Sequence, residues 1–399
     1  MRIAAVCMMK NEEVLAESAV RYWLTFCDLV IVYDHYSTDG TSDILGALQE
    51  EYAERLILYK PDFPVSFEWQ QKEITNAMIR EAFLVHRADM VLPLDADEFP
   101  YVSNRGTSVR DLLSSLNLHS CYRVSSVPYA LPQENGGLDT SRLLPLSFRF
   151  RKRPLFLQTP KCILTRSPYL EDTIDVTMGN HDLFRLSGKD LPPIVDLSPS
   201  LYYTHYPYQS ISQFKAKNAV GWLASYCNPD WAPGVSYHLE HSAEQMISGE
   251  PVTADRVNWN IFTSFGKTGE SMSEIQLEEI DPSGYFPDIP LRYTERFSRK
   301  KDAFTLLLEQ SLSVAEAYKK QQQALKLGQE EKDQLKAELA VQEEEKAHLL
   351  ETLEKQKQET AFLREEIERI QTSRSYRLGR LATWLPRKMR NRLRKTVVK

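Results

Sequence analysis

Short apolar runs alternate with longer amphipathic segments over the first hundred residues. Ile3–Met9 is apolar throughout, as expected for a strand that is buried on both faces. Further strand-like runs lie at 28–34, 55–59 and 89–94, with helical patterns between them at about 11–25, 42–51 and 68–86. This alternation predicts an α/β fold, a mostly parallel sheet with helices on both faces. Ligands of such sheets bind beyond the carboxyl ends of the strands.

The pattern changes twice further along the chain. Residues 103–293 are less regular, with prolines, aromatics and strand-like runs at 120–127 and 146–151. We expect this region to continue the first sheet. After about residue 299, Glu, Lys, Gln, Leu and Ala dominate, and the next proline is Pro386. The sequence therefore predicts a folded domain at 1–300, a long helix at 301–373 and a tail at 374–399.

Leucine and isoleucine pairs recur every fourteen residues within the long helix. A spacing of three and four connects Leu325, Leu335, Leu339, Leu349, Leu353, Leu363, Ile367 and Ile370. The other positions of this seam are polar or small: Gly328, Lys332, Gln342, Lys346, Gln356 and Thr360. The pattern favours a parallel coiled coil of modest stability and hence a homo-oligomer. The alternative is a single charged helix held by pairs of side chains four residues apart.

The charge is distributed unevenly along the chain. The net charge is −6, yet residues 374–399 hold ten Lys or Arg and no Asp or Glu. The tail is thus basic, the rest of the chain is acidic, and Leu378, Leu381, Trp384 and Leu385 lie among the basic residues. This composition is typical of an interfacial helix on an anionic membrane surface. Nucleic acid is the other polyanion to consider, and the acidic body without a nucleic-acid motif argues against it.

Cysteine usage and hydropathy bear on the compartment. The five cysteines, Cys7, Cys27, Cys121, Cys162 and Cys227, form no CxxC pair. An odd number of unpatterned cysteines fits reduced thiols and a cytoplasmic location better than a disulfide framework. No run of eighteen apolar residues is present, so we expect no membrane-spanning helix. The charged residues after Met9 make the first apolar run a strand and not a signal peptide.

Paired carboxylates follow the fourth strand-like run, in Leu94-Asp95-Ala96-Asp97-Glu98-Phe99. Side chains two positions apart in an extended segment share one face, so Asp95 and Asp97 are expected to point together. At an effective dielectric constant near 20, two unit charges about 4 Å apart repel by about 4 kcal/mol unless a cation lies between them. Oxygen ligands suit Mg²⁺ or Mn²⁺. A surface DxD without function is the alternative.

A second polar segment follows the second strand-like run and reads Asp34-His35-Tyr36-Ser37-Thr38-Asp39-Gly40-Thr41. Asp34 ends a buried strand, where its carboxylate can accept hydrogen bonds from a base or a ribose. Asp39-Gly40 is a turn signal by itself. The alternative makes Asp34 a helix cap.

The order of these motifs resembles that of the family 2 glycosyltransferases of the GT-A fold. The resemblance rests on Lys10-Asn11-Glu12 after the first strand, on Asp34 with Ser37–Thr41, and on Asp95-Ala96-Asp97-Glu98, and it covers roughly residues 1–250. It is closest to a bacterial branch that carries a DADEF motif. His35 and Tyr36 replace the Asp and Gly that are usual in the family, which leaves the base preference open.

The resemblance implies a role for each of these residues. Asp95 and Asp97 bind Mn²⁺ or Mg²⁺, and Asp95 also meets the donor. Lys10, Asn11, Glu12 and Asp34 hold the nucleoside of a nucleotide-diphosphate sugar. GT-A enzymes often complete the metal shell with a late histidine, here His181 or His205, and imidazole suits Mn²⁺. Gly179 favours His181, because glycine permits close backbone approach. The alternative for either histidine is a core residue whose ring nitrogens are hydrogen-bonded within the protein.

Members of family 2 mostly invert the anomeric centre, so the resemblance implies a carboxylate base that takes the proton of the acceptor hydroxyl. Leu170-Glu171-Asp172 resembles the acidic motif that supplies it in GT-A enzymes, with Asp172 first, then Glu171 and Asp175. A solvated acidic loop is the alternative. A basic run, Arg142, Arg149, Arg151, Lys152 and Arg153, indicates either an anionic acceptor site or a charged edge strand.

The sequence thus predicts a metal-dependent, inverting, hexosyltransferase-like enzyme that acts on a saccharide or lipid-linked acceptor in surface polysaccharide synthesis. The basic tail implies a peripheral position on the inner face of the cytoplasmic membrane, because similar tails follow coiled coils in the enzymes it resembles. A nucleotidyltransferase acting on sugar phosphates is one alternative, although Cys7–Asn11 lacks a glycine-rich phosphate loop. A coiled-coil scaffold with a ligand-binding α/β domain is the other.

Overall fold

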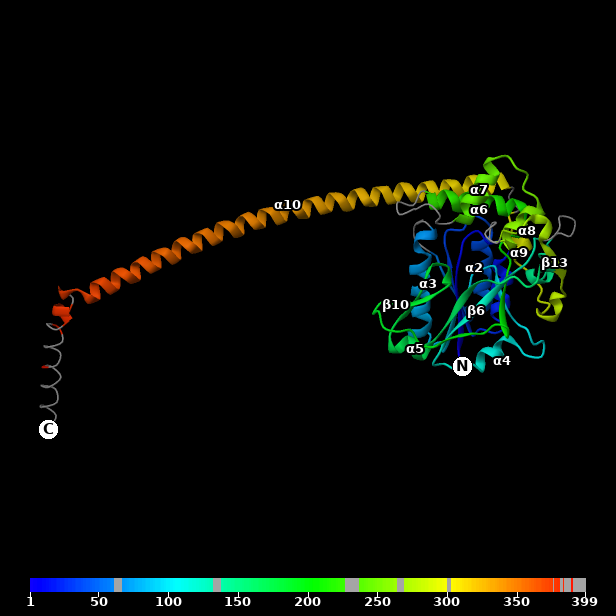
Figure 1. Ribbon diagram of the computed structural model, residues 1–399, viewed down its shortest axis with the longest axis horizontal. Coiled ribbons are helices and arrows are strands. Elements are labelled where there is room, and N and C mark those ends of the chain that lie inside the picture. Colours follow the sequence, from blue (N-terminus) through cyan, green and yellow to red (C-terminus); the bar gives the residue numbers. More distant parts are fainter. Residues whose placement is uncertain are drawn as a thin grey trace, which may run out of the picture. The chain divides into compact units, whose positions relative to one another are not determined.

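The computed structural model describes residues 1–60, 67–131, 138–226, 237–263, 269–299 and 303–375, together with 377–380, 383 and 389 (Figure 1). The chain divides into two compact units, Met1–Lys320 and Gln321–Lys399. All strands of the described residues belong to the first unit. Most of one long helix and the tail belong to the second.

The elements have the following bounds. The strands are β1 (Ile3–Met9), β2 (Leu29–Asp34), β3 (Leu56–Tyr59), β4 (Met90–Pro93), β5 (Glu98–Val102), β6 (Cys121–Pro128), β7 (Phe150–Arg153), β8 (Gln158–Thr165), β9 (Ile174–Val176), β10 (Leu183–Arg185), β11 (Ile194–Asp196), β12 (Leu201–His205) and β13 (Gln276–Glu279). The α-helices are α1 (Ala16–Trp23), α2 (Thr41–Tyr52), α3 (Phe67–Leu84), α4 (Val109–Ser114), α5 (Arg166–Glu171), α6 (Ile211–Tyr226), α7 (Tyr237–Ile247), α8 (Ala254–Phe262), α9 (Thr294–Phe297) and α10 (Ala303–Thr372).

One large sheet organises the first unit. Its strand order is β3-β2-β1-β4-β8-β6-β12-β5, and β11 pairs with β6. Strands β3, β2, β1 and β4 are parallel to one another, and β6 is parallel to β12 and β11. Strand β8 is antiparallel to β4 and β6, and β5 is antiparallel to β12. The α/β class with a mostly parallel sheet is therefore confirmed.

Both faces of the sheet are buried, which explains the unbroken apolar run of β1. Ile3 and Cys7 belong to the core that includes side chains of α1 and α2. Ala4 and Val6 belong to the core on the other face, which includes side chains of α3. Alternate side chains of a strand point to opposite faces, so every residue of β1 must be apolar to meet a packed helix layer. In Figure 1, α2 and α3 stand on either side of the sheet.

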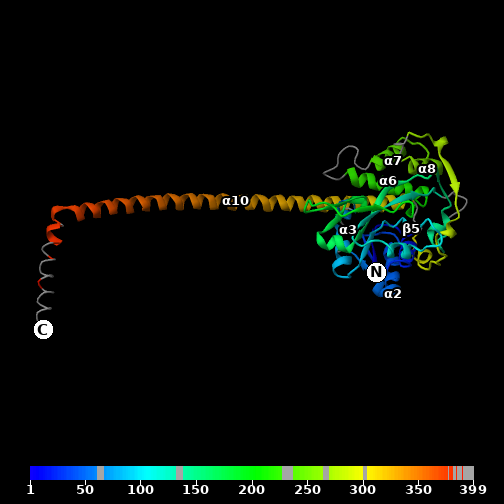
Figure 2. The same cartoon turned by 60° about the horizontal axis from the view of Figure 1, so that its bottom comes forward.

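The second half of the sheet is packed by aromatic side chains. Tyr206 is fully buried, and its ring centroid lies 4.4 Å from that of Phe148, 5.2 Å from that of Tyr129 and 5.6 Å from that of Phe99. The indole nitrogen of Trp23 donates a hydrogen bond of 3.1 Å to the carbonyl of Glu98. Helix α1 thus holds the start of β5 in place. Helices α6, α7 and α8 lie together at one end of the unit (Figure 1 and Figure 2).

Two local expectations from the sequence differ from the structure. Helix α1 begins at Ala16 and not near residue 11, because the backbone of Asn11 turns away with a φ of 56° and donates a hydrogen bond to Ser37 Oγ. The strand expected at 146–151 is displaced to β7, which forms a two-stranded sheet with β13. Sequence patterns miss such shifts because partners far along the chain decide them.

The basic run is paired with acids. Arg142 pairs with Asp288, Lys152 pairs with Glu270, and Arg151 Nε lies 2.7 Å from Glu278 Oε1. Arg151 and Lys152 belong to β7, and Glu278 lies opposite them on β13. These ion pairs support the interpretation as a charged edge strand.

The long helix predicted after residue 300 is observed as α10. Its apolar side chains are exposed, including Leu335, Leu349 and Leu363. Within the described part of the chain, no helix combines the length and the hydropathy that are needed to cross a membrane. Much of the expected interfacial tail lies outside the described residues, including Leu381, Trp384, Leu385 and every basic residue from Arg387 onward.

Candidate active site

Charged side chains from distant segments meet beyond the carboxyl ends of the parallel strands. Glu12 follows β1, and Asp95 and Asp97 follow β4. His205 ends β12, and Lys217 lies on α6. The parallel strands bring the first group to one edge, as the sequence predicts. The antiparallel pairing of β12 with β5 adds His205, because His205 is the register partner of Glu98.

The DxD segment forms a turn and is not extended as expected. The backbone N–H of Glu98 donates to the carbonyl of Asp95 at 3.0 Å, and Glu98 then begins β5. Asp95 and Asp97 therefore do not share one face of an extended strand, contrary to the prediction from the sequence. A turn followed at once by an antiparallel strand bends the chain within the motif. The two carboxylates nevertheless belong to one charge cluster, since both act on the ammonium group of Lys161.

Asp95 is held by a buried lysine. The ammonium of Lys161, on β8, is hydrogen-bonded to Asp95 Oδ2 and lies 3.1 Å from Glu98 Oε1. Only 7% of the Lys161 side chain is exposed. Burial lowers the pKa of Lys161, but Asp95 and Glu98 outweigh it and hold the pKa well above its usual value. Lys161 is thus a fixed internal counter-ion for this part of the site.

Asp97 faces His205. The Nε2 atom of His205 lies 3.4 Å from Asp97 Oδ2, and its Nδ1 atom lies 2.6 Å from Gln158 Oε1. Since an amide oxygen only accepts, His205 Nδ1 carries the hydrogen of that bond, and Nε2 faces the carboxylate. Burial opposes the charge on Asp97, yet His205, Lys217 and Lys161 together hold its pKa well below the usual range.

His181 lies in the same neighbourhood but has a different partner. Its Nδ1 atom lies 3.2 Å from the carbonyl oxygen of Pro160, to which it donates. Gly179, with a φ of 75°, gives the ring its space, because a Cβ there would lie 2.8 Å from His181 Cδ2. Burial, followed by the charge of Lys161, lowers the pKa of His181. The close approach expected at Gly179 is present, while the histidine that faces Asp97 is His205.

The donor set fits a small divalent cation that also binds a ligand. In the described part of the chain, no three His, Cys, Asp or Glu side chains are arranged to enclose an ion. Asp97 Oδ2 and His205 Nε2, 3.4 Å apart, are farther from each other than a strong hydrogen bond requires. Adjacent ligands of a small dication at about 2.1 Å are separated by roughly 3 Å. Mg²⁺ sites commonly combine one or two protein ligands with water and phosphate oxygens.

The charge balance of the site also favours a cation. The carboxyl groups of Glu12, Asp95, Asp97 and Glu98 surround the ammonium groups of Lys161 and Lys217. Burial raises the pKa of Glu98 to about 7 against the effect of Lys161. Burial likewise raises the pKa of Glu12 to about 7, although Lys217 opposes the shift. Glu12 Oε2 is buried and has no hydrogen-bond partner. Four carboxyl groups thus surround two ammonium groups, and His205 adds positive charge only when its ring is protonated.

Asp34 closes the loop that follows β2. Its Oδ1 atom accepts a hydrogen bond of 3.2 Å from the backbone of Ser37, and its Oδ2 atom accepts one from Ser42 Oγ. The cap of α2 is Gly40, so Asp34 is not the helix cap. Lys10 lies near this loop, because its charge contributes to lowering the pKa of His35 to about 4, after the larger effect of burial.

The segments after β1 and β2 are joined to each other. Asn11 Oδ1 accepts a hydrogen bond of 2.7 Å from the backbone N–H of Thr38. The backbone N–H of Glu12 donates to Thr41 Oγ1 at 2.8 Å. Asn11 and Glu12 thus fix the shape of the 37–41 loop.

A segment near residue 299 supports the same loop. Glu13 Oε2 accepts hydrogen bonds from the backbone N–H groups of Gly40 at 2.8 Å and Arg299 at 2.9 Å. Arg299 Nη1 donates to the carbonyl of Thr38 at 2.9 Å. The loop is therefore held by Glu13 on one side and by Arg299 on the other, although these residues are more than 260 positions apart in the chain.

The same segment is anchored on α1. The carboxylate of Glu17, which is fully buried, accepts backbone hydrogen bonds of 2.7 Å from Arg292, Tyr293 and Thr294. We call residues 292–299 the strap. This support could not be predicted from the sequence, because no local pattern relates Glu13 and Glu17 to the strap.

The structure places Asp172 and Glu171 away from Asp97. Both follow β8, whose last residue, Thr165, is the register partner of Met90 at the start of β4. They therefore lie beyond the amino end of β4, whereas Asp97 follows its carboxyl end. The assignment of Asp172 or Glu171 as the base of this site is wrong, because the antiparallel direction of β8 carries them to the opposite edge of the sheet.

Local contacts explain these acids. Asp172 Oδ2 is hydrogen-bonded to Ser187 Oγ and lies 3.8 Å from Lys189 Nζ and from Arg185 Nη1. Asp175 is buried in β9, where its register partner is Phe184.

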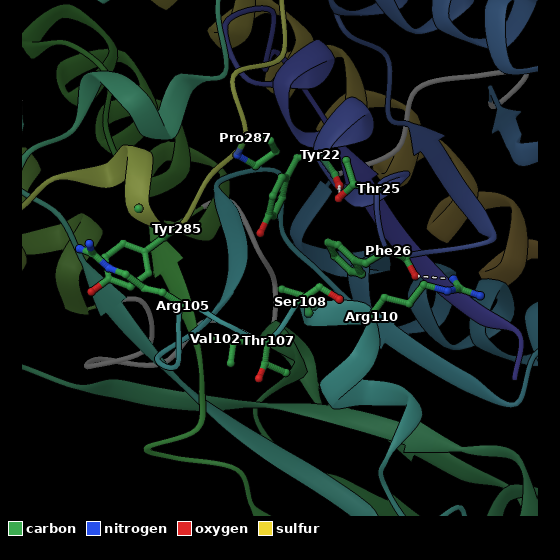
Figure 3. A pocket seen from close by; sticks show the side chains of 12 residues that line it. Tyr22, Thr25, Phe26, Val102, Arg105, Thr107, Ser108, Arg110, Tyr285 and Pro287 are labelled. Atoms are coloured by element: carbon green, nitrogen blue, oxygen red, sulfur yellow. Dashed lines mark hydrogen bonds between the residues drawn. The ribbon is translucent and has the colours of Figure 1, made fainter.

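A separate cavity of about 240 Å³ lies elsewhere in the first unit (Figure 3). Its lining includes Tyr22, Phe26, Arg105, Ser108, Arg110 and Tyr285. The guanidinium of Arg105 lies over the Tyr285 ring, 4.9 Å from its centroid, and Arg110 is paired with Asp28. None of the predicted site residues lines it, so we place the candidate site at Asp97.

The sequence matches no protein-family model and no curated protein. Among solved structures, it is similar to the mannosyltransferase PcManGT from Pyrobaculum calidifontis in complex with GDP-Man and Mn²⁺, with 12% identity, a TM-score of 0.33, and 79% of this chain and 86% of that chain covered.

Two synthases of known structure are similar to this chain with comparable identities and TM-scores. Mannosyl-3-phosphoglycerate synthase from Rubrobacter xylanophilus has 11% identity and a TM-score of 0.29 over 75% of this chain and 89% of that one. Glucosyl-3-phosphoglycerate synthase from Mycobacterium tuberculosis has 14% identity and a TM-score of 0.28 over 63% of this chain and 81% of that one. Likeness at these TM-scores assigns no residue and no activity to this chain.

Gly40→Ala tests the packing of the strap on the loop. A Cβ at position 40 would lie 2.3 Å from the carbonyl oxygen of Phe297, so the strap must move. We expect the free energy of unfolding to fall by about 1–3 kcal/mol, the usual cost of overpacking. Gly46→Ala is the control, since it lies in α2 with no atom within 4 Å of its Cβ, and there alanine should stabilise by up to about 1 kcal/mol.

Urea unfolding followed by tryptophan fluorescence measures both variants. A methyl group would meet the backbone of Phe297 at position 40, whereas at position 46 it has room and favours the helix, so the signs of the two changes should be opposite. Equal effects of the two substitutions would contradict the close packing of the strap on Gly40.

Proposed function

We propose that this protein is a metal-dependent glycosyltransferase that uses a nucleotide-diphosphate sugar. The observation that carries the proposal is the pair formed by Asp97 and His205, 3.4 Å apart, beyond the carboxyl ends of the parallel strands. Asp34 and the loop cross-linked to Asn11 and Glu12 lie at the same edge. A cation and a nucleotide can thus be held side by side, as transfer from a nucleotide sugar requires.

The metal-binding residues of the proposal are Asp97 and His205, with Asp95 held beside them by Lys161. Mn²⁺ or Mg²⁺ at this position would stabilise the negative charge of the departing diphosphate as a Lewis acid. The excess of carboxylates over ammonium groups in the site supports this role. His181 stands second to His205, because its Nδ1 atom is hydrogen-bonded to the carbonyl of Pro160 and not to a carboxylate.

The nucleoside is assigned to Asp34, Lys10, Asn11 and Glu12. Asp34 accepts one bond from Ser37 in the loop and one from Ser42 at the start of α2, and a carboxylate can accept further bonds from a base or a ribose. Asn11, Glu12 and Glu13 keep the loop in one shape, which reduces the entropy lost on binding. Asp95 completes the donor side of the site, at the point where the sugar diphosphate would lie.

The acceptor that we propose is a saccharide or a lipid-linked saccharide in surface polysaccharide synthesis. Inversion would need a carboxylate base within hydrogen-bond reach of the acceptor hydroxyl. Asp172 and Glu171 lie at the other edge of the sheet, so the proposal of glycosyl transfer stands on Asp97 and His205 and not on an assigned base.

The C-terminal region supports a second part of the proposal. Leu335, Leu349, Leu353 and Leu363 are 47–68% exposed along α10, which favours self-association through a coiled coil. The basic tail favours an anionic surface on the cytoplasmic face of a membrane. We therefore propose that the protein is an oligomer bound peripherally to the cytoplasmic face of a membrane and that it does not bind nucleic acid.

Product analysis separates this function from its alternatives. A glycosyltransferase releases a nucleoside diphosphate from a nucleotide sugar, and slow hydrolysis in Mn²⁺ without an acceptor produces the same product. A nucleotidyltransferase instead releases pyrophosphate from a nucleoside triphosphate and a sugar phosphate. A scaffold releases neither. Incubating the full chain with UDP- and GDP-sugars, or with UTP or GTP and sugar phosphates, therefore distinguishes the candidates.

Asp97→Asn should abolish nucleotide-sugar turnover while the protein stays folded. Asparagine keeps the size of the side chain but removes the charge that a cation needs. Release of nucleoside diphosphate at saturating Mn²⁺ should fall by more than tenfold, which corresponds to at least about 1.4 kcal/mol. Asp255→Asn, at an exposed position of α8, should retain full activity. Retention of more than a tenth of the activity by Asp97→Asn would remove Asp97 from the metal site.

His205→Ala should weaken Mn²⁺ more than His181→Ala does. Only His205 presents a ring nitrogen to Asp97, whereas His181 donates to a backbone carbonyl. The Mn²⁺ concentration at half-maximal turnover should rise at least tenfold for His205→Ala. A larger rise for His181→Ala would reverse the assignment, and no rise in either variant would exclude histidine from the site.

Paired lysine substitutions in α10 test the oligomer. Leu349→Lys with Leu353→Lys places charge on the leucine seam and should give a monomer. Leu327→Lys with Val341→Lys, at exposed positions outside the seam, should leave the oligomer intact. Sedimentation of the full chain at about ten micromolar measures each. A monomeric unsubstituted protein, or equal disruption by both pairs, would refute the coiled coil.

A further inference from the structure

The site contains a second lysine whose environment differs from that of Lys161. Lys217 Nζ lies 3.5 Å from Glu12 Oε1 and 3.6 Å from Asp97 Oδ2. Charge-assisted hydrogen bonds from ammonium to carboxylate are usually about 2.7–2.9 Å long. In addition, 42% of the Lys217 side chain is exposed, against 7% for Lys161. Lys217 is thus held loosely by charge, while Lys161 is bonded and enclosed.

The backbone that carries Lys217 is well anchored. Phe214, one turn earlier on α6, is buried, and Asn218 Nδ2 donates to the carbonyl of Phe214 at 2.8 Å and to Tyr208 Oη at 3.1 Å. The fixed helix leaves movement to the lysine side chain, which has four rotatable bonds and a compact charge at its end.

A divalent cation on Asp97 would change the position that Lys217 prefers. The ammonium now lies near the carboxylate oxygen that faces His205, so the two cations would compete for Asp97 and repel each other. With 42% of its side chain exposed, Lys217 can turn from the two carboxylates toward an anionic ligand of such a cation. In the proposed function this ligand is the diphosphate of the donor.

We propose that Lys217 is a diphosphate-binding residue. Without ligands, its ammonium lies between Glu12 and Asp97. When a cation and a nucleoside diphosphate bind, Lys217 leaves these carboxylates and donates to the diphosphate oxygens, adding positive charge to the leaving group. This inference rests on the proposed function, since it assigns a further residue to the same donor. Lys161 stays with Asp95 and Glu98 throughout.

The proposal predicts opposite effects on metal and diphosphate binding. Lys217→Met keeps the length and apolar stem of the side chain and removes its charge. Without the competing ammonium, Mn²⁺ alone should bind as tightly as before or up to about fivefold more tightly, the scale of a partly exposed ion pair. At saturating Mn²⁺, UDP or GDP should bind at least about tenfold more weakly, because a charge-assisted hydrogen bond is lost.

Matched variants and probes complete the experiment. Lys215→Met removes the same charge from an exposed position two residues earlier on α6, and it should alter neither affinity more than twofold. Lys217→Arg retains the charge and should recover most of the affinity for the nucleoside diphosphate. Inorganic pyrophosphate lacks base and ribose, so the same loss of affinity for it would assign the effect to the diphosphate. Free Mn²⁺ is measured by its paramagnetic resonance, and the other ligands by calorimetry.

The outcomes separate this inference from the proposed function. Unchanged binding of the nucleoside diphosphate by Lys217→Met would overturn the inference alone. Loss of Mn²⁺ binding in Lys217→Met would also overturn it, because the lysine would then be a structural part of the metal site. Unsubstituted protein that binds Mn²⁺ but neither UDP nor GDP would overturn the proposed function and the inference with it.

Discussion

An excess of carboxylates at one edge of the sheet is the constraint on which the rest of the site depends. Burying like charges together is costly unless cations accompany them. Lys161 supplies one internal cation and fixes Asp95 and Glu98. Asp97 is left with His205 and a loosely placed Lys217. The site is thus built to receive positive charge, and a dication with its phosphate ligand is the species that fits both the charge and the spacing.

The supporting structure uses carboxylates in another way. Glu13 and Glu17 accept backbone hydrogen bonds from residues of the strap, and Glu13 also accepts one from Gly40. A buried carboxylate that accepts several N–H bonds keeps its charge without a metal. Glu17 shows the consequence, because its bonds to Arg292, Arg21, Thr294 and Tyr293 lower its pKa against the opposing and largest effect, burial. The 37–41 loop is therefore rigid before any ligand arrives.

Local patterns predicted the parallel half of the fold well. The apolar runs of β1, β2 and β4 and the polar residues at their ends place Glu12, Asp34 and Asp97 at one edge, since parallel strands end together. The antiparallel half was beyond such reasoning, because pairing between distant segments leaves little local signal. Strand β12 brings in His205, and β8 brings in Lys161 but takes Asp172 to the opposite edge. Lys161 is the charged residue among the buried residues of β8. A lysine beside the apolar run of this strand was the one sequence signal that pointed to the site.

The central claim is that Asp97 and His205 bind a divalent cation together with a nucleoside diphosphate. Anomalous diffraction from crystals grown with Mn²⁺ and UDP or GDP tests it most directly. The account predicts a manganese peak at roughly 2.1 Å from both the Asp97 carboxylate and His205 Nε2, with diphosphate oxygens completing its shell. A nucleotide bound without manganese between these residues, or manganese bound elsewhere, would contradict it.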